Sequence, residues 1–325
     1  MNKYLVVLAA AMLVACGGKD KDGTDTSVAG DDDDDSCVDI LEFFPADGDG
    51  AVYYRTAIEF TMEETDGSES ITVDGLDGSS AVVDNKVVFT PTGNLDPSTS
   101  YTVTLDWACG PTSTTWTTSA VGAAANEDDL IGSTYALDLA TGRFVYPAGI
   151  GPLIQQELEQ PILMGVTDIT GSDLQMMGAL GTTGTPPAQD MCAPSIDFPV
   201  AADFSENPYF VIGPEQITLD IEGIEIEIED MIISGAFAPD GSYVAGATLA
   251  GAIDTRPLAG LLGATGDDDA ICDLVVTFGV ACEACPDQTD YCLSVFVDNM
   301  VGDSVPGSLV EVVQDDIDNN GDCTE

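Results

Sequence analysis

The chain has 325 residues, and its 58 Asp and Glu against 7 Lys and Arg give a formal net charge of −51. Nucleic acid and anionic lipid headgroups both bind Lys and Arg, so a chain this acidic excludes them as partners. The sequence contains no histidine, which removes the commonest general base and the usual Ser-His-Asp and Cys-His nucleophile arrangements. No pair of carboxylates stands out among so many, and we predict that the protein is not an enzyme.

The same composition indicates which partners the chain attracts. Cations, basic proteins and basic envelope polymers are the natural counterparts of a strongly acidic surface. A salt-rich habitat favours the same composition, because dissolved salt screens the mutual repulsion of surface carboxylates. Composition alone leaves both explanations open.

Residues 1–15 have the pattern of an export signal. Lys3 supplies a positive charge, residues 4–12 are apolar, and residues 13–16 read Leu-Val-Ala-Cys. The apolar run is too short for a transmembrane helix, which needs about 20 residues. The segment resembles the signal peptide and lipobox of bacterial lipoproteins. The resemblance implies cleavage before Cys16 and acyl chains, such as palmitate, that hold this cysteine to a membrane.

Residues 16–36 follow as an acidic segment with no hydrophobic periodicity. Such a composition predicts a disordered tether between the lipid and the fold. Gly17 and Gly18, rather than Asp, come directly after the cysteine. By resemblance to the usual lipoprotein sorting pattern, this implies the cell envelope and favours the outer membrane, with periplasmic or surface display left open.

Residues 37–119 have the pattern of an all-β domain, with short β-branched and aromatic runs separated by turn signals. They resemble the S-layer-type bacterial Ig-like domain, most specifically in the Leu-x-Pro-x-Thr-x-Tyr run that ends at Tyr101. The resemblance implies a β-sandwich that serves for spacing, display or adhesion. The alternation after Pro97 predicts a strand that buries Tyr101, Val103 and Leu105, with the Tyr101 hydroxyl anchoring the corner.

A linker over residues 120–129 and a second β-rich domain over residues 130–298 follow. The clearest part of this domain is an antiparallel meander, in which apolar and acidic residues alternate over 216–222 and 224–237 before a turn into 242–253. Short helices are predicted at 153–160 and 269–280. The fold class is therefore mainly β: an Ig-like sandwich, then a disulfide-stapled domain built on a meander.

The meander carries a row of acids, Glu225, Glu227, Glu229 and Asp230. We predict that the row is the solvated face of a sheet whose other face packs on the core. A cation-binding face and the lumen of a barrel are the alternatives. Helices beside a twisted sheet are also typical of pockets for lipid-like ligands, so an apolar-ligand binding domain is a second hypothesis.

Nine cysteines remain to be assigned, and lipidation of Cys16 leaves an even number. In an oxidising compartment the default prediction is four disulfides. Cys37 and Cys109 bracket the first domain and are the one pair that we predict. A metal or redox site at the Cys-x-x-Cys motif is the alternative. The eight residues are Cys37, Cys109, Cys192, Cys272, Cys282, Cys285, Cys292 and Cys323.

Residues 299–325 form a predicted acidic C-terminal tail. Asp316, Asp318 and Asn320, followed by a glycine, resemble the start of an EF-hand-like calcium loop, with Asp322 as a further ligand. The bidentate acid at the twelfth position would fall beyond Glu325. Calcium is therefore the one cofactor that the sequence suggests, and an acidic, frayed end is the alternative.

From these features we predict a non-enzymatic, membrane-anchored lipoprotein that presents its two domains for structural, adhesive or binding purposes. The alternative is a binding protein for an apolar ligand or for calcium through the second domain and tail. A carboxylate-based glycosidase is a more distant hypothesis, since it needs two acids facing each other across one cleft.

Overall fold

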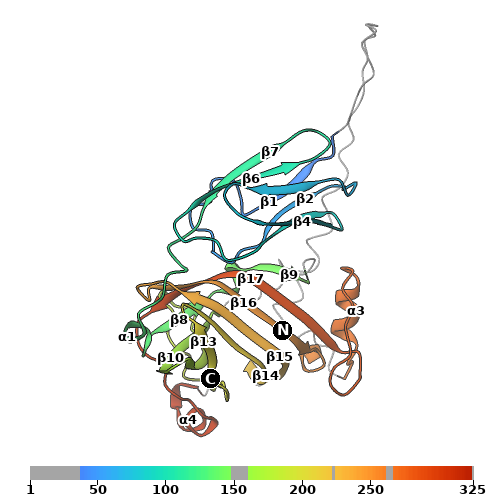
Figure 1. Cartoon of the computed structure of the whole chain (residues 1–325). Coiled ribbons are helices and arrows are strands. Elements are labelled where there is room, and N and C mark those ends of the chain that lie inside the picture. The colour runs from blue at the N-terminus through green and yellow to red at the C-terminus, as the bar shows by residue number, and fades with distance from the viewer. Residues whose placement is uncertain (1–36, 148–159, 222–223, 261–265, 324–325) are drawn as a thin grey trace, which may run out of the picture. The chain divides into compact units, whose positions relative to one another are not determined.

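The computed structural model describes residues 37–147, 160–221, 224–260 and 266–323. Residues 39–325 form one compact unit. Cys16, the predicted tether and all but the last residue of the predicted helix at 153–160 lie outside the described residues. The described chain is mainly β, as predicted, with strands in three sheets (Figure 1).

The first seven strands form a two-sheet domain, in which every pairing between these strands is antiparallel. The sheets have the orders β1-β2-β5-β4 and β3-β6-β7. The strands are β1 (Ile40–Phe44), β2 (Ile58–Met62), β3 (Ser70–Val73), β4 (Gly78–Val83), β5 (Lys86–Pro91), β6 (Ser100–Asp106) and β7 (Thr112–Thr117).

The core of the two-sheet domain follows from the alternation in its strands. Along β6, Tyr101, Val103 and Leu105 are buried on one face, which confirms the prediction. The Tyr101 hydroxyl accepts a hydrogen bond from the backbone N–H of Asp96 at 2.9 Å, so it does anchor the corner before its strand. Its ring packs on the buried Trp116 of β7, with ring centroids 5.2 Å apart.

The second domain is a closed barrel of eight antiparallel strands rather than an open meander. β10 pairs with β8 on one side and with β11 on the other, and these pairings close the ring. The strands are β8 (Thr134–Leu137), β10 (Ile162–Thr170), β11 (Asp173–Leu180), β13 (Ala202–Glu206), β14 (Tyr209–Ile221), β15 (Ile224–Phe237), β16 (Tyr243–Asp254) and β17 (Cys292–Val305).

The predicted meander is present as the neighbours β14, β15 and β16 (Figure 1). The alternation of residues along each strand does not reveal that the barrel closes. Closure depends on strands far apart in sequence, such as β8 and β17, where Leu137 lies opposite Gly302. Two short strands complete the sheet: β9 (Arg143–Tyr146) pairs with β17, and β12 (Ile196–Asp197) pairs with β11.

Large apolar side chains fill the interior of the barrel. Phe237 packs against Tyr135 and Phe210, with ring centroids 5.2 and 4.9 Å away. The Tyr135 hydroxyl donates a hydrogen bond to the carbonyl of Gly241 at 3.0 Å, so its polar end is satisfied inside the core. An eight-stranded barrel has an interior about wide enough for side chains to fill, and side chains fill it here.

The acidic row of β15 lies on the outside of the barrel. Glu225, Glu227 and Asp230 are exposed, whereas Ile226 and Ile228 between them are buried. This arrangement confirms the predicted apolar and carboxylate faces, and it contradicts the alternative that these acids line a lumen.

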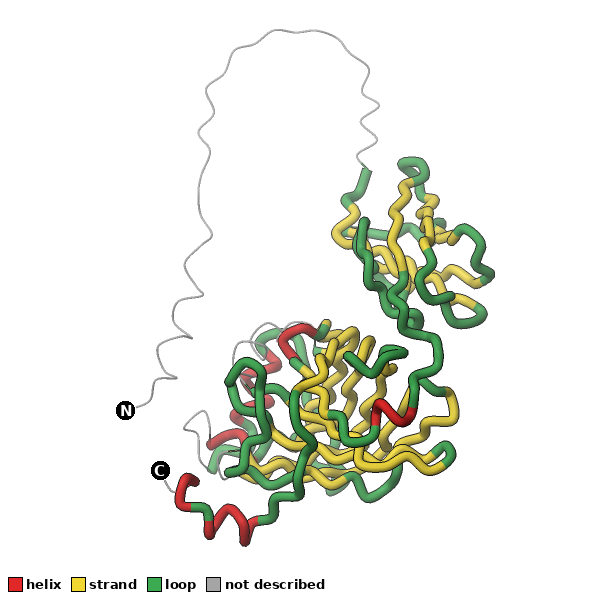
Figure 2. Tube along the Cα trace, turned by 90° about the vertical axis from the view of Figure 1, so that its left-hand side faces the viewer, coloured by secondary structure: helices red, strands yellow, loops and turns green. Residues whose placement is uncertain are grey.

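Helices are few and short (Figure 2). They are α1 (Glu127–Leu130), α3 (Ala270–Val276) and α4 (Gln314–Asn319), with 3-10 turns η2 (Leu139–Thr141), η3 (Pro257–Gly260) and η4 (Gly321–Cys323). α3 lies within the helix predicted at 269–280. No helix in the described ranges is long and apolar enough to cross a bilayer.

The C-terminal segment is part of the fold rather than a separate tail. β17 runs to Val305, past the predicted boundary at residue 298, and pairs there with β8. Val312 is 2% exposed, and its backbone N–H donates to the Ser195 hydroxyl at 3.1 Å. The segment from 299 to 323 therefore packs on the barrel.

Candidate functional site

The cysteines of the barrel domain pair across its loops. Cys192 is bonded to Cys323, Cys272 to Cys282, and Cys285 to Cys292. The two cysteines of the Cys-x-x-Cys motif thus have different partners, which contradicts a redox pair or metal site there. Cys37 and Cys109 are also disulfide-bonded. Their pairing with each other stays a prediction.

The proposed calcium residues lie on short helical turns rather than in an open loop. Asp316 and Asp318 belong to α4, and Asp322 belongs to η4. Asp316 accepts a bond from the Val313 N–H at 3.1 Å, and Asp318 accepts one from the Gln314 amide at 2.9 Å. The Asp322 N–H donates to the Asn320 side chain at 3.1 Å. Calcium binding here stays a prediction.

The scarce basic side chains indicate a different site. After residue 36 the sequence contains only Arg55, Lys86, Arg143 and Arg256. Each of the four forms an ion pair. Three of them lie where the two-sheet domain contacts the barrel, so most of the folded chain's positive charge is placed at this junction.

Arg143 of β9 links the two domains. Its Nε and Nη2 donate to the two carboxylate oxygens of Asp298 on β17, at 2.9 and 2.7 Å. Its Nη1 donates to Oε1 of Glu59 on β2, which also accepts from Lys86 Nζ at 2.8 Å. The guanidinium lies 4.0 Å from the centre of the Phe44 ring. One arginine therefore joins β2 to β17.

Glu59 is the buried member of this group, with 7% exposure. Burial raises the pKa of its carboxyl, but the hydrogen bonds and charges of Lys86 and Arg143 outweigh that effect and hold the pKa below its usual value. The carboxylate is thus kept ionised where the domains meet.

A second link is made by Arg55, which follows a buried tyrosine pair in the loop after β1. Its Nη2 pairs with Glu206 of β13, and its Nε donates to the Tyr54 hydroxyl at 3.1 Å. The guanidinium also lies 3.9 Å from the centre of the Tyr209 ring of β14, a cation–π contact.

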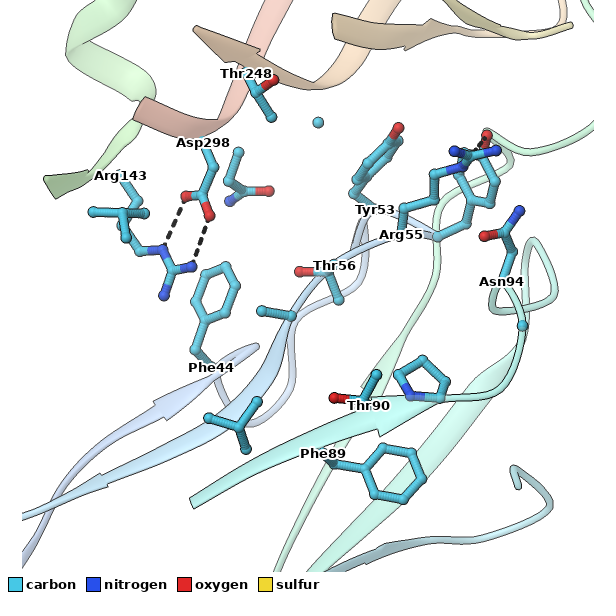
Figure 3. A pocket seen from close by; sticks show the side chains of 18 of the residues that line it. Phe44, Tyr53, Arg55, Thr56, Phe89, Thr90, Asn94, Arg143, Thr248 and Asp298 are labelled. Atoms are coloured by element: carbon cyan, nitrogen blue, oxygen red, sulfur yellow. Dashed lines mark hydrogen bonds and ion pairs between the residues drawn. The ribbon is translucent and has the colours of Figure 1, made fainter. Parts of the chain in front are cut away.

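Between these two arginine links lies a pocket of about 640 Å³. Figure 3 shows Phe44, Tyr53, Thr56 and Thr90 reaching it from the two-sheet domain, opposite Thr248 and Asp298 of the barrel. A volume between about 300 and 1,000 Å³ is typical of small-molecule sites, which occur preferentially at domain junctions.

The pocket is much less acidic than the rest of the chain. Of the described residues that line it, Asp298 is the one carboxylate, and Arg55 and Arg143 are the cations. The guanidiniums already face carboxylates, so the pocket carries little free charge. Its remaining surface is aromatic, aliphatic, hydroxyl and amide.

Tyr53 forms one wall of the pocket and packs closely on the barrel. Gly246 of β16 has a φ of +56°, and a Cβ built on it would lie 2.1 Å from Cδ1 of the Tyr53 ring. Glycine is therefore required both by backbone conformation and by space. The Tyr53 hydroxyl is buried and has no hydrogen-bond partner among the described residues.

That hydroxyl stays protonated at physiological pH. Burial raises the pKa of the Tyr53 hydroxyl well above its ordinary value, and the neighbouring Tyr54 and Tyr209 raise it further. An unpaired buried hydroxyl costs about 1–3 kcal/mol.

Several polar side chains of the pocket are available to form hydrogen bonds with a ligand. Among the described residues, no partner bonds the side chains of Thr56, Thr90, Asn94 or Asn299. Asn299 lies within β17 beside Asp298 and has a φ of 56°, a conformation that asparagine tolerates better than most residues. The pocket therefore offers both donors and acceptors to a ligand.

Sequence reasoning did not find this pocket, because its lining comes from several segments separated by tens to hundreds of residues. The sequence nonetheless contains one indication of this site, the positions of its few basic residues. In a chain with so few cations, their positions mark structural or functional contacts, and three of the four that follow residue 36 lie at this junction.

A second hollow of about 530 Å³ lies beside Val312 and Phe198, where the C-terminal segment crosses the barrel.

Comparisons with protein-family models, with curated proteins and with solved structures find no significant match for this chain. Its function must therefore be argued from its own residues.

Proposed function

We propose that this chain is a non-enzymatic lipoprotein of the cell envelope, anchored through acyl chains on Cys16. It presents an Ig-like domain and a disulfide-stapled barrel for binding, and the pocket at their junction is its binding site. The outer membrane is the favoured location. An apolar ligand inside the barrel has no support, because apolar side chains of the described residues fill its interior.

The observation that carries the proposal is the state of the cysteines. All eight cysteines from Cys37 to Cys323 are disulfide-bonded. Disulfides persist in oxidising compartments outside the cytoplasm. Export is therefore supported, and Cys16, which follows a lipobox-like sequence, is left over for lipidation.

The strand order supports the Ig-like assignment of the two-sheet domain. The orders β1-β2-β5-β4 and β3-β6-β7 correspond to the ABED and CFG sheets of a constant-type Ig domain. Tyr101 lies near the start of β6, the equivalent of strand F, and its hydroxyl bonds the backbone upstream at Asp96. This bond resembles the tyrosine corner of such sandwiches and supports the proposal.

Lipid labelling tests the anchoring. We would express the full chain in a bacterium supplied with radiolabelled palmitate and follow both the label and the partition of the protein into detergent. We expect a labelled, membrane-bound product whose label is lost in Cys16→Ser. The matched control, Met12→Ser, changes the signal without removing the acceptor thiol. Absence of label from the wild-type chain, or label retained by Cys16→Ser, contradicts the proposal.

A further inference from the structure

We propose that the pocket at the domain junction binds a short segment of a neutral polysaccharide. This inference deepens the proposed binding function by naming the ligand class of the same site. It is independent of the anchor, because the pocket lies wholly within the unit from residue 39 onward.

Charge excludes the other simple ligand classes. A metal cation would face one carboxylate, Asp298, whose two oxygens already accept hydrogen bonds from Nε and Nη2 of Arg143. A phosphate or similar anion would need a free guanidinium fork. All three nitrogens of Arg143 already donate to Asp298 or Glu59. Arg55 likewise pairs with Glu206 and Tyr54. A neutral ligand is the one that fits.

Polar groups without partners indicate a ligand rich in hydroxyls. The side chains of Thr90 and Asn94, both exposed, project from the end of β5 and the loop after it, and Asn299 lies across the pocket on β17. Hydroxyl groups of a sugar donate and accept at once, and so satisfy amides and hydroxyls without requiring charge.

Exposed apolar and aromatic side chains of the pocket supply the packing contacts that sugar recognition also needs. The C–H faces of a sugar ring are apolar and pack on aromatic rings, while the hydroxyls around the ring form hydrogen bonds. Phe296 of β17 lines the pocket with 36% exposure, and the neighbouring Val145 is 38% exposed. These partly exposed side chains give the lining apolar surface on which a sugar ring can pack, and a longer saccharide can extend from there into solvent.

Two variants isolate these contributions. Phe296→Ala removes the exposed ring, and Asn94→Ala removes an exposed amide. Because both side chains are exposed, neither change empties the core. Phe278→Ala is the matched control, since Phe278 is also exposed, at 44%, and does not line the pocket. Thermal unfolding of each variant confirms that the fold is retained.

The experiment is saturation-transfer NMR and calorimetry on the full chain in detergent micelles. The probes are neutral hexasaccharides of glucose, mannose, xylose and N-acetylglucosamine, with inorganic phosphate and calcium chloride as separate arms. We expect at least one hexasaccharide to bind, and each pocket variant to weaken it about tenfold, as the loss of one stacking or hydrogen-bonding contact predicts. Phe278→Ala should bind as the wild type does.

Three results overturn the inference. They are no binding of any hexasaccharide, binding that both pocket variants leave unchanged, and a response to phosphate or calcium alone. None of them bears on lipidation, which the palmitate label decides separately. Loss of the label with saccharide binding intact would instead refute the anchor and keep the ligand.

Discussion

Gly246 shows how one residue controls the contact between the domains. Its left-handed backbone and the Tyr53 ring that lies against it leave no room for a Cβ. We expect Gly246→Ala to lower the free energy of unfolding by about 2–4 kcal/mol, since backbone strain and a steric clash each cost about 1–3 kcal/mol. Urea denaturation measures the loss.

Gly307 is the matched control for that change. It also has a positive φ, of +94°, but a Cβ there meets nothing within 4 Å. Gly307→Ala therefore reports backbone strain alone. Equal losses in the two variants would mean that the Tyr53 contact contributes nothing.

Glu59 gives the junction a dependence on pH. Because the folded state holds its pKa below the ordinary value of 4.5, ionised Glu59 stabilises the fold above that pH. The contribution is lost as the pH falls through the lowered pKa. Glu59→Gln should therefore be less stable than the wild type at pH 7, by about 1.5–3 kcal/mol, the value of hydrogen bonds to charged groups. The difference should shrink on acidification.

Unfolding of both proteins between pH 7 and pH 3 tests this expectation. Glu225→Gln, in the exposed acidic row of β15, controls for removal of a carboxylate from so acidic a chain. A stability gap between the wild type and Glu59→Gln that stays constant with pH would contradict the assigned role of Glu59.

At the scale of elements, the disulfides differ chiefly in the length of chain that they close. Cys192 and Cys323 are 131 residues apart, and Cys285 and Cys292 are 7 apart. On the chain-entropy model, losing the first costs about 5 kcal/mol and losing the second about 2.5 kcal/mol. We expect the double variant Cys192→Ser/Cys323→Ser to melt at a clearly lower temperature than Cys285→Ser/Cys292→Ser. Calorimetry under non-reducing conditions measures both.

The reverse order of melting temperatures would show that hydrogen bonds already hold the C-terminal segment on the barrel. Those bonds include the Val312 N–H to the Ser195 hydroxyl and the Ser195 N–H to the Val312 carbonyl, at 3.1 and 3.0 Å.

The positions of the strands were more predictable from the sequence than their arrangement in the sheets. The strand at Tyr101 and the meander from β14 to β16 were predictable, because alternation along a strand reports which face is buried. Closure of the barrel was not, since it depends on pairings such as β8 with β17, which leave no local pattern. The resemblance of residues 316–322 to the start of a calcium loop, and the alternative of a frayed end, also missed the short helix α4, because acidic residues at alternate positions are compatible with a helix as well.

At the scale of the whole molecule, the positions of the basic side chains matter more than their number. The chain carries a formal net charge of −51, yet Arg143 is placed between Glu59 of one domain and Asp298 of the other. The pocket was not predictable because neither domain contains it alone. Its walls come together only when the two-sheet domain docks on the barrel.

Arg143→Ala should therefore uncouple the domains. The change leaves Asp298 without its bidentate partner and removes one of the two cations on Glu59, at a cost of about 1.5–3 kcal/mol per lost charged hydrogen-bonded pair. Losing these pairs weakens the contact between the two domains more than it weakens the hydrophobic core of either domain. We expect calorimetry to show one transition for the wild type and two for Arg143→Ala, and the hexasaccharide response to fall with it. Arg256→Ala removes an equal charge at a residue that does not line the pocket and that pairs with Asp254 and Asp287. It should keep a single transition, and splitting in both variants would trace the effect to net charge instead of to the junction.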